Sequence, residues 1–421
     1  MATTSDPPRT HFSLGMLLTD TRYRSLTIQV IALALFALAI AWLVDNAIQN
    51  LEALDKGFSF GFLFTTAGYD VNQSFIDYSS QSTHSRAAVI GIMNTLLIAV
   101  MGCVTATFIG VAAGVLRLSR NWLIARLMSI YVEGFRNIPL LFWILLIAAV
   151  VNESLPPPAA FRGEDAVASM VLFDSIAFTN RGIYVPEPLF SRSLGNIDVA
   201  GYFAISVDLL VFLVALFAGI WASRRVGAWA SAKQAQTGSR PAVFWPRVAL
   251  VLGPTLAVLI ALGFHLGLPY LPERGIANFR DGVHMRDSLI AMWIALSLYT
   301  GAFIAEIVRA GILAVNKGQT EASYALGLRP GPTMNLVILP QALRVIVPPL
   351  ISQYLNLTKN SSLAIAVGYM DATGTLGGIT LNQTGREMEC ILLLMAFYLV
   401  LSLTISAAMN VYNERVKLKE R

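Results

Sequence analysis

The sequence predicts an all-α, polytopic membrane protein, a bundle of about eight transmembrane helices. Hydrophobic residues make up 56% of the 421 positions and charged residues only 13%, whereas a soluble domain carries roughly a quarter charged residues. The apolar residues gather in runs long enough for a helix of about 20 residues to cross the hydrocarbon. These runs are far longer than the alternating strands of a transmembrane barrel. In lipid, an isolated span satisfies its backbone polar groups as a helix.

The predicted spans are separated by segments of unequal length. We expect the eight spans at roughly Leu26–Val44, Ala87–Leu116, Trp122–Val151, Tyr202–Ser223, Val248–Leu271, Ser288–Val315, Val345–Met370 and Cys390–Tyr412. The first span contains a triplet of small residues, Ala39-Ile40-Ala41, that imitates a signal-peptide cleavage site. We expect this span to be retained, because the run is long enough to anchor the chain.

This spacing predicts three regions. Residues 1–86 hold the first span and a long extracytoplasmic loop, residues 87–412 form the transmembrane domain, and residues 413–421 form a basic cytoplasmic tail. Within the second region, about residues 152–287 add an extra helical hairpin. We predict a multi-pass protein with both termini cytoplasmic, since the segments placed inside then carry roughly twice as many Lys and Arg residues as the outer ones.

The basic residues follow this topology. The inner segment Arg224–Arg247 is basic without an acidic residue, which is typical of a turn beside anionic membrane lipid. We find no dense basic and aromatic patch of the kind that binds nucleic acid. The net charge of +5 therefore indicates membrane orientation rather than a nucleic-acid partner.

One inner segment is too compact for a loose linker. In "EASYALGLRPGPTMNLVILPQAL", Glu321 to Leu343, we expect Thr320 to cap a short helix that begins at Glu321, and Gly327 to supply the left-handed stop. Pro330-Gly331-Pro332 then predicts a turn, a second short segment follows over Thr333–Leu339, and Pro340 closes it. A helix-turn-helix of this size on the cytoplasmic face is typical of a docking element.

The same stretch resembles the cytoplasmic coupling loop of permease subunits of bacterial ABC-type importers. The family pattern is Glu-Ala-Ala, three residues, Gly, nine residues, Ile, any residue, then Leu-Pro. The matching positions here, with Ser and Val replacing Ala and Ile, are Glu321, Ala322, Ser323, Gly327, Val337, Leu339 and Pro340. The resemblance implies a type I ABC importer permease fold, with this loop seated in a groove of an ATPase subunit. An ordinary amphipathic connector is the alternative interpretation.

Further segments resemble permeases for polar amino acids. They are "YVEGFRNIPLL" (131–141), "YTGAFIAEIVRAGI" (299–312), "KGQTEA" (317–322) and "LTKNSSLA" (357–364). With the extra hairpin, the set is similar to the larger permease subunit of bacterial general L-amino acid transporters. The resemblance implies the inner membrane as location and, as partners, a second homologous permease subunit, two ATPase subunits and an extracytoplasmic, periplasmic amino acid-binding protein. It implies no cofactor on this chain, since ATP and Mg are used by the partner ATPase.

Charged residues inside spans are functional candidates, because each costs about 2.5–3.5 kcal/mol at mid-membrane on insertion scales. Lys359 stands among polar residues, Asn360, Ser361 and Ser362 being its neighbours. Two interpretations stay open: these residues line the translocation path and attract a substrate carboxylate, or Lys359 forms an ion pair with Glu306. The pairs Glu306 with Arg309 and Glu133 with Arg136 repeat one spacing on a helix face near inner ends. For these pairs we favour bracing of the bundle over substrate contact.

Catalytic signatures are absent from the sequence. There is no G-x-x-x-x-G-K-[ST] phosphate loop, so the chain cannot hydrolyse ATP alone. The four histidines have no metal-ligand spacing, and we predict neither a catalytic nor a metal site. The sequence therefore favours a non-catalytic permease subunit that moves L-amino acids by alternating access. An ion-gradient-driven secondary amino acid transporter and a membrane-embedded enzyme are the rival hypotheses.

Overall fold

A computed structural model describes residues 21–53, 57–71, 73–74, 76–163, 166–199, 203–239 and 241–416. The chain forms two compact units, Met1–Gly61 and Phe62–Arg421. Most of the predicted basic tail, residues 417–421, lies outside the described residues.

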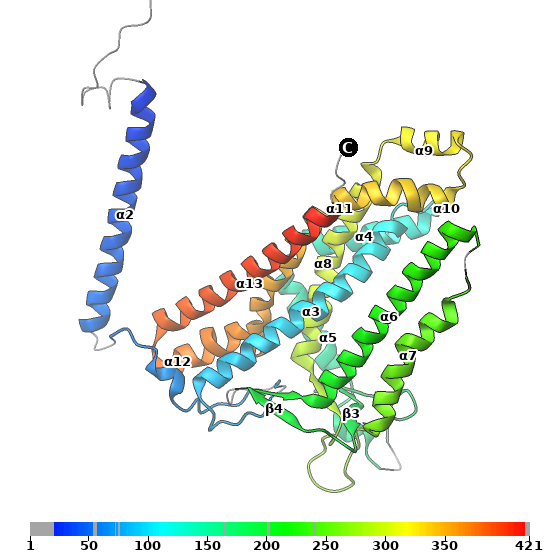
Figure 1. Cartoon of the computed structure of the whole chain (residues 1–421). Coiled ribbons are helices and arrows are strands. Elements are labelled where there is room, and N and C mark those ends of the chain that lie inside the picture. The colour runs from blue at the N-terminus through cyan, green and yellow to red at the C-terminus, as the bar shows by residue number, and fades with distance from the viewer. Residues whose placement is uncertain are drawn as a thin grey trace, which may run out of the picture. The chain divides into compact units, whose positions relative to one another are not determined.

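The described chain is mainly helical, with short strands gathered at the ends of α6 (Val207–Thr237) and α7 (Phe244–Ala261) (Figure 1). Its α-helices are α2 (Thr21–Ala53), α3 (His84–Leu116), α4 (Trp122–Asn137), α5 (Leu140–Ser154), α6 (Val207–Thr237), α7 (Phe244–Ala261), α8 (Asp287–Leu313), α9 (Lys317–Ala325), α10 (Pro330–Thr333), α11 (Leu339–Asn360), α12 (Leu381–Thr384) and α13 (Glu387–Val416). Tighter or wider helical turns are η1 (Gly61–Phe64), η2 (Pro158–Phe161), η3 (Met334–Ile338), η4 (Ser361–Val367) and η5 (Thr373–Thr380). The strands are β1 (Ala177–Thr179), β2 (Gly182–Val185), β3 (Glu187–Phe190), β4 (Asn196–Val199), β5 (Phe203–Ser206), β6 (Phe264–Gly267) and β7 (Val283–Arg286).

Eight helical stretches of the described chain are long and apolar enough to cross a membrane, which agrees with the predicted number. They are Tyr23–Asn50, His84–Leu116, Leu140–Phe161, Val207–Thr237, Phe244–Ala261, Asp287–Leu313, Pro330–Val367 and Glu387–Val411. Burial differs strongly among them. The Asp287–Leu313 span has 72% of its most apolar window buried, whereas the Tyr23–Asn50 span has none buried. Helix α8 is therefore the centre of the second unit.

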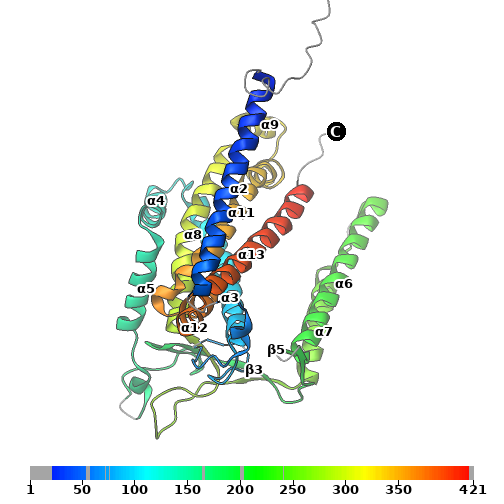
Figure 2. The same ribbon diagram turned by 90° about the vertical axis from the view of Figure 1, so that its left-hand side faces the viewer.

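The predicted third span was wrong in its extent. Its inner part is a separate amphipathic helix, α4, and the chain turns at Ile138 before α5 begins (Figure 2). Ile138 has extended backbone, with φ −109° and ψ 133°. The ring of Pro139 disfavours helical conformation in the preceding residue, which accounts for the break at Ile138. The prediction missed it because it joined the amphipathic residues of α4 to the apolar residues of α5 in one span.

The predicted fourth and fifth spans were also misplaced at their outer ends. The chain is a β-strand over β5 and becomes helical only at Val207, and α7 ends at Ala261. Gly263 then adopts a φ of +66°, and β6 follows where the prediction extended the helix to Leu271. The segment predicted as an inner loop is helical as far as Thr237.

Three small antiparallel sheets lie at the N-terminal ends of α6 and α8 and at the C-terminal end of α7. Strands β1, β2 and β7 form one sheet, β3 pairs with β6, and β4 pairs with β5. Since Pro186 alone separates β2 from β3, and α8 begins directly after β7, the sheets gather at the N-terminal end of α8. We call this end the sheet side and the opposite end, where α9 follows α8, the α9 side.

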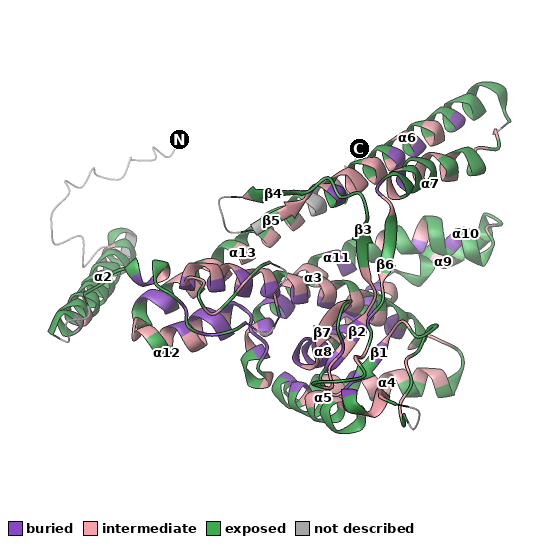
Figure 3. Ribbon diagram, turned by 90° about the horizontal axis from the view of Figure 1, so that it is seen from below, coloured by how far each residue is buried: buried purple, intermediate pink, exposed green. Residues whose placement is uncertain are grey.

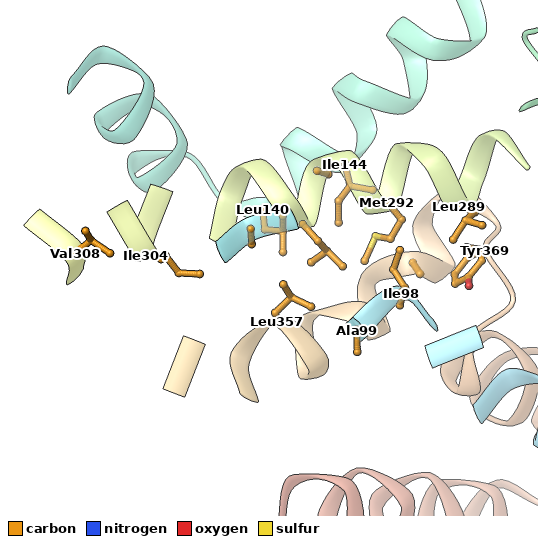
Figure 4. Packing of buried hydrophobic residues seen from close by; sticks show 14 of the residues in the cluster. Ile98, Ala99, Leu140, Ile144, Leu289, Met292, Ile304, Val308, Leu357 and Tyr369 are labelled. Atoms are coloured by element: carbon orange, nitrogen blue, oxygen red, sulfur yellow. The ribbon is translucent and has the colours of Figure 1, made fainter. Parts of the chain in front are cut away.

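The core of the second unit lies between α3, α5, α8 and α11. Buried side chains of these helices point toward one another around Met292 and Leu357 (Figure 4). Helices α3 and α8 approach so closely that a Cβ on Gly110 would lie 2.8 Å from the carbonyl oxygen of Gly301. A Cβ on Gly114 would lie 2.6 Å from the carbonyl oxygen of Ala305. Small residues spaced four apart therefore set this contact, as is typical of membrane helix pairs.

Candidate coupling surface and translocation path

The predicted docking element is a helix-turn-helix, but its first helix begins one turn earlier than expected. The cap of α9 is Asn316, whose side chain accepts a hydrogen bond from the Gly318 amide, so the prediction that Thr320 caps the helix was wrong. Glu321 and Ala322 consequently lie in the middle of α9 and are exposed. Ser323 is 4% exposed, and its hydroxyl donates to the Gln319 carbonyl over 2.7 Å.

Gly327 ends α9 in the predicted left-handed conformation, with φ +77°. The Gly327 amide donates to the Tyr324 carbonyl over 2.9 Å and the Leu328 amide to the Ser323 carbonyl over 3.0 Å. These two bonds define a Schellman motif, in which a glycine avoids the steric cost of positive φ. No other atom lies within 4 Å of the position of a Cβ on Gly327, so backbone conformation alone selects the glycine.

The second half of the element differs from the prediction. Pro340 does not close a separate segment, because α10, η3 and α11 follow one another as one helical run from Pro330 to Asn360. A wide turn at η3, with the Leu339 amide bonded to the Met334 carbonyl, absorbs the proline. The Gln341 side chain donates to the Val337 carbonyl over 3.0 Å. Helix α9 lies beside this run (Figure 1), and Gln341 donates to Gln319 over 3.3 Å.

The two halves of the element bury few residues between them and expose apolar ones. Ser323, Thr333 and Ile338 are buried. In contrast, Leu326 is 82% and Leu336 is 71% exposed, and Leu339 and Pro340 are also exposed. Exposed large apolar residues on a polar scaffold indicate a protein contact surface. We call residues 317–343 the coupling surface.

A cluster of charges lies where α3, α4 and α8 meet, at the α9 side. Glu306 binds Arg309 over 2.7 Å, as their spacing predicted, and also pairs with Arg117. Arg136 approaches the same carboxylate at 3.7 Å, and its guanidinium lies 5.4 Å from the ring centroid of Phe303. The carboxylate thus joins three helices.

Glu133 and Arg136 do not form a pair within a membrane span. They lie on α4, which is not one of the eight span candidates, and Glu133 is exposed with no ion pair among the described residues. Arg136 instead turns toward α8. Arg117 was not predicted to belong to this cluster, because it lies just beyond the end of the apolar run that forms α3.

Lys359 is not near Glu306, so the interpretation as an ion pair between them was wrong. The prediction placed Lys359 at the centre of its span, whereas it lies in the last turn of α11. Helix α8 carries Glu306 toward the α9 side, and α11 carries Lys359 in the other direction. Lys359 is exposed and forms no ion pair within the described part of the chain.

The neighbours of Lys359 face different directions. Ser361 is fully buried and donates to the Thr358 carbonyl over 2.8 Å, and Ser362 donates to the Lys359 carbonyl over 2.8 Å. Asn360 is half-buried. Exposed polar residues on α11 recur as Ser352, Asn356 and Lys359, which are spaced to lie on one face of a helix.

A buried polar cluster near the sheet side was not predicted. Asp371 is fully buried and accepts hydrogen bonds from the Gly374 amide at 2.8 Å and the Tyr398 hydroxyl at 3.3 Å. The Asn94 side chain, also fully buried, donates to the Met370 carbonyl over 2.8 Å. A charged residue directly after a predicted span was the available signal in the sequence.

Comparison with known proteins places the chain in a family. Residues 106–418 match the model of the "Binding-protein-dependent transport system inner membrane component" family. The chain is 56% identical, over the full length of both proteins, to the glutamate/glutamine/aspartate/asparagine transport system permease protein BztB of Rhodobacter capsulatus. It is 41% identical, over 98% of this chain and 97% of the relative, to the general L-amino acid transport system permease protein AapQ of Rhizobium johnstonii.

A solved amino acid ABC transporter "with histidines" is similar over 79% of this chain and 95% of its own chain, at 19% identity and a TM-score of 0.43. The family match covers most of the transmembrane unit and includes the coupling surface. It confirms the resemblance to ABC importer permeases that the motifs indicated. The chain belongs to the family of binding-protein-dependent transport system inner membrane components.

Proposed function

We propose that this chain is the permease subunit of an ATP-driven importer that moves L-amino acids across the bacterial inner membrane. Its family membership and the amino acid permeases that resemble it along their whole length support this function. The single observation that carries the coupling mechanism is the coupling surface: a capped short helix that presents apolar residues and continues into a membrane-spanning helix.

The proposed assembly contains a second homologous permease subunit, two ATPase subunits and a periplasmic amino acid-binding protein. ATP and Mg are used by the ATPase subunits, and this chain contributes no catalytic group. Both termini and the α9 side face the cytoplasm in this arrangement. The sheet side then faces the binding protein.

Coupling follows from how the α9 side is connected. Leu326 and Leu336 are the most exposed apolar side chains of the coupling surface, which suits burial in a groove of the ATPase. The bond from Gln341 to Gln319 and the Schellman turn hold α9 against the helical run that begins at Pro330. Movement of the ATPase is therefore passed to α11.

The proposed translocation path follows the polar face of α11. Ser352, Asn356 and Lys359 are exposed on a helix that crosses the membrane. An exposed lysine in a membrane span faces a water-filled cavity or a partner rather than lipid. We place Lys359 where it attracts the carboxylate of an amino acid, and we assign a bracing role to the Glu306 cluster with Arg309 and Arg136.

The test is ATP-dependent uptake of labelled L-glutamate and L-glutamine into vesicles that contain the reconstituted subunits, with ATP inside and binding protein outside. The variants are Gly327→Val and the matched control Gly327→Asn. Asn tolerates positive φ, whereas a β-branched residue does not. Since a side chain meets no atom at this site, the two variants differ in backbone strain rather than in packing.

We expect Gly327→Val to lower uptake and Gly327→Asn to retain most of it, with equal insertion of both. Equal uptake by the two variants would contradict the coupling role of the turn. Uptake that continues without the ATPase and depends on an ion gradient would overturn the ATP-driven mechanism itself. It would instead support the hypothesis of a secondary amino acid transporter.

A further inference from the structure

The hairpin of α6 and α7 is built for close contact between its two helices. A Cβ on Gly219 would lie 2.6 Å from the Leu250 carbonyl oxygen, and Ser223 and Ala230 are buried farther along α6. Apart from this contact strip, most of the hairpin surface is exposed (Figure 3). The N-terminal end of α6 and the C-terminal end of α7 both adjoin strands on the sheet side, so the turn between the two helices lies on the α9 side.

Arg247 crosses from α7 to α6 within this contact. Its Nε donates to the Ser223 hydroxyl over 3.3 Å. The missing side chain of Gly227, one turn farther along α6, leaves room for the guanidinium, because a Cβ there would lie 3.3 Å from the Arg247 Cζ. Arg247 is half-buried and joins none of the ion pairs found among the described residues.

The sequence around Arg247 offers no carboxylate. Between Asp208 and Glu273 the chain contains no acidic residue, and its basic residues there are Arg224, Arg225, Lys233, Arg240 and Arg247. Arginine stays protonated and presents five N–H donors. The half-buried cation at position 247 therefore lacks a nearby anion from its own hairpin, because Asp208 lies at the opposite end of α6 and accepts hydrogen bonds from Ser193 and Leu194.

A cavity beside Arg247 has two chemically different parts. It has a volume of about 460 Å³ and is lined by Ser223, Phe244, Arg247, Val248, Val251 and Leu252. Ser223 and Arg247 form a polar end. Val248, Val251 and Leu252 continue along α7 away from the turn, which is toward the membrane interior. The cavity thus matches an amphiphile with an anionic head and an apolar chain.

The neighbouring side chains are typical of a membrane interface. The Arg225 guanidinium lies 5.0 Å from the ring of Trp221, and the Lys233 ammonium lies 5.1 Å from the ring of Trp229. Trp245, next to the cavity-lining Phe244, is 75% exposed. Aromatic rings and basic residues together mark the headgroup level of a bilayer, and basic clusters there attract anionic lipid.

We propose that this cavity binds an anionic phospholipid from the leaflet on the α9 side. Arg247 and Ser223 hold the headgroup phosphate, and an acyl chain lies along Val248, Val251 and Leu252. Arg247 is the specific anchor, whereas the other basic residues raise the local concentration of anionic lipid. This inference does not depend on which solute the protein transports.

The experiment is native mass spectrometry of the full-length chain, purified with its partner subunits and titrated with phosphatidylglycerol or phosphatidylcholine. The charge variants are Arg247→Gln and the matched control Arg225→Gln, since both remove one positive charge from the hairpin. The apolar variants are Leu252→Trp, which fills the cavity, and Leu256→Trp, whose leucine is equally exposed one turn farther along α7 but does not line the cavity.

We expect phosphatidylglycerol to bind more tightly than phosphatidylcholine. Arg247→Gln should weaken this binding by about tenfold or more, because it removes a hydrogen bond to a charged group. Arg225→Gln should have a smaller effect, and Leu252→Trp should weaken binding where Leu256→Trp does not. Equal losses from the two arginine variants, or equal binding of the two lipids, would overturn the site. Displacement of lipid by inorganic phosphate alone would show a phosphate site instead of a lipid site.

Discussion

The close contact of α3 with α8 makes Gly110 sensitive to the smallest possible enlargement. In Gly110→Ala the new Cβ would lie 2.6 Å from the Ile304 Cγ2 and 2.8 Å from the Gly301 carbonyl oxygen. Ordinary van der Waals contact begins at 3.4 Å, so the helices must separate by several tenths of an ångström. Overpacking of this kind costs about 1–3 kcal/mol. This cost outweighs the stabilisation of up to about 1 kcal/mol that replacing glycine with alanine gives to a helix interior.

The matched control is Gly253→Ala in α7, where a Cβ meets no atom within 4 Å. Unfolding can be followed by a thiol-reactive dye, because Cys390 is buried and Cys103 is partly buried in the folded chain. We expect a melting temperature lower by a few degrees for Gly110→Ala at a fixed scan rate, and an unchanged or higher one for Gly253→Ala. If the two variants melt together, the α3–α8 contact is not limited by glycine and the packing argument fails.

Three further outcomes are expected. Glu306→Gln should lower the free energy of unfolding by about 1–3 kcal/mol, because it leaves Arg117 and Arg309 without their carboxylate. The control Glu133→Gln, at an exposed site, should leave the melting temperature unchanged. Equal effects of the two variants on the melting temperature would argue against a stabilising role of the cluster. Burial lowers the pKa of His284, whose ring stacks on that of Tyr184 with the centroids 4.1 Å apart. Its contribution to stability is therefore complete above pH 6.5 and decreases as the pH falls below that value. His284→Phe should make the melting temperature depend less on pH between pH 8 and 5, and an unchanged pH dependence would refute this assignment. Lys359→Met should lower uptake while Lys359→Arg retains more of it and melting stays the same, whereas a lower melting temperature for Lys359→Met would indicate a structural role.

Hydropathy predicted the membrane helices well because it depends on local composition. The α9 turn was also predictable, since Gly327 carries its conformational signal in one residue. Local rules failed where one predicted element concealed a change of structure. Ile138-Pro139 separates an amphipathic helix from an apolar one within a single predicted span, and η3 lets Pro340 stand within a helical run that was predicted to close there.

The charge cluster was only half predictable. Glu306 and Arg309 are three residues apart on one helix, so their contact follows from helical geometry. Arg117 is 189 positions away from Glu306, and only the packing of α3 on α8 brings them together. One of the two interpretations left open for Lys359 paired it with Glu306, since both belong to predicted spans. The opposite directions of α8 and α11 separate them, and depth along each helix would have been the better guide.

The continuous backbone from Pro330 to Asn360 has a mechanical consequence. The run bends rather than staying straight, because it contains the wide turn at η3 and two prolines inside α11, Pro348 and Pro349. One end carries the apolar residues of the coupling surface, and the other carries Lys359. Prolines remove backbone hydrogen bonds and concentrate bending at their own positions. A rotation of the coupling surface therefore reaches Lys359 as a change of bend within one continuous helical run.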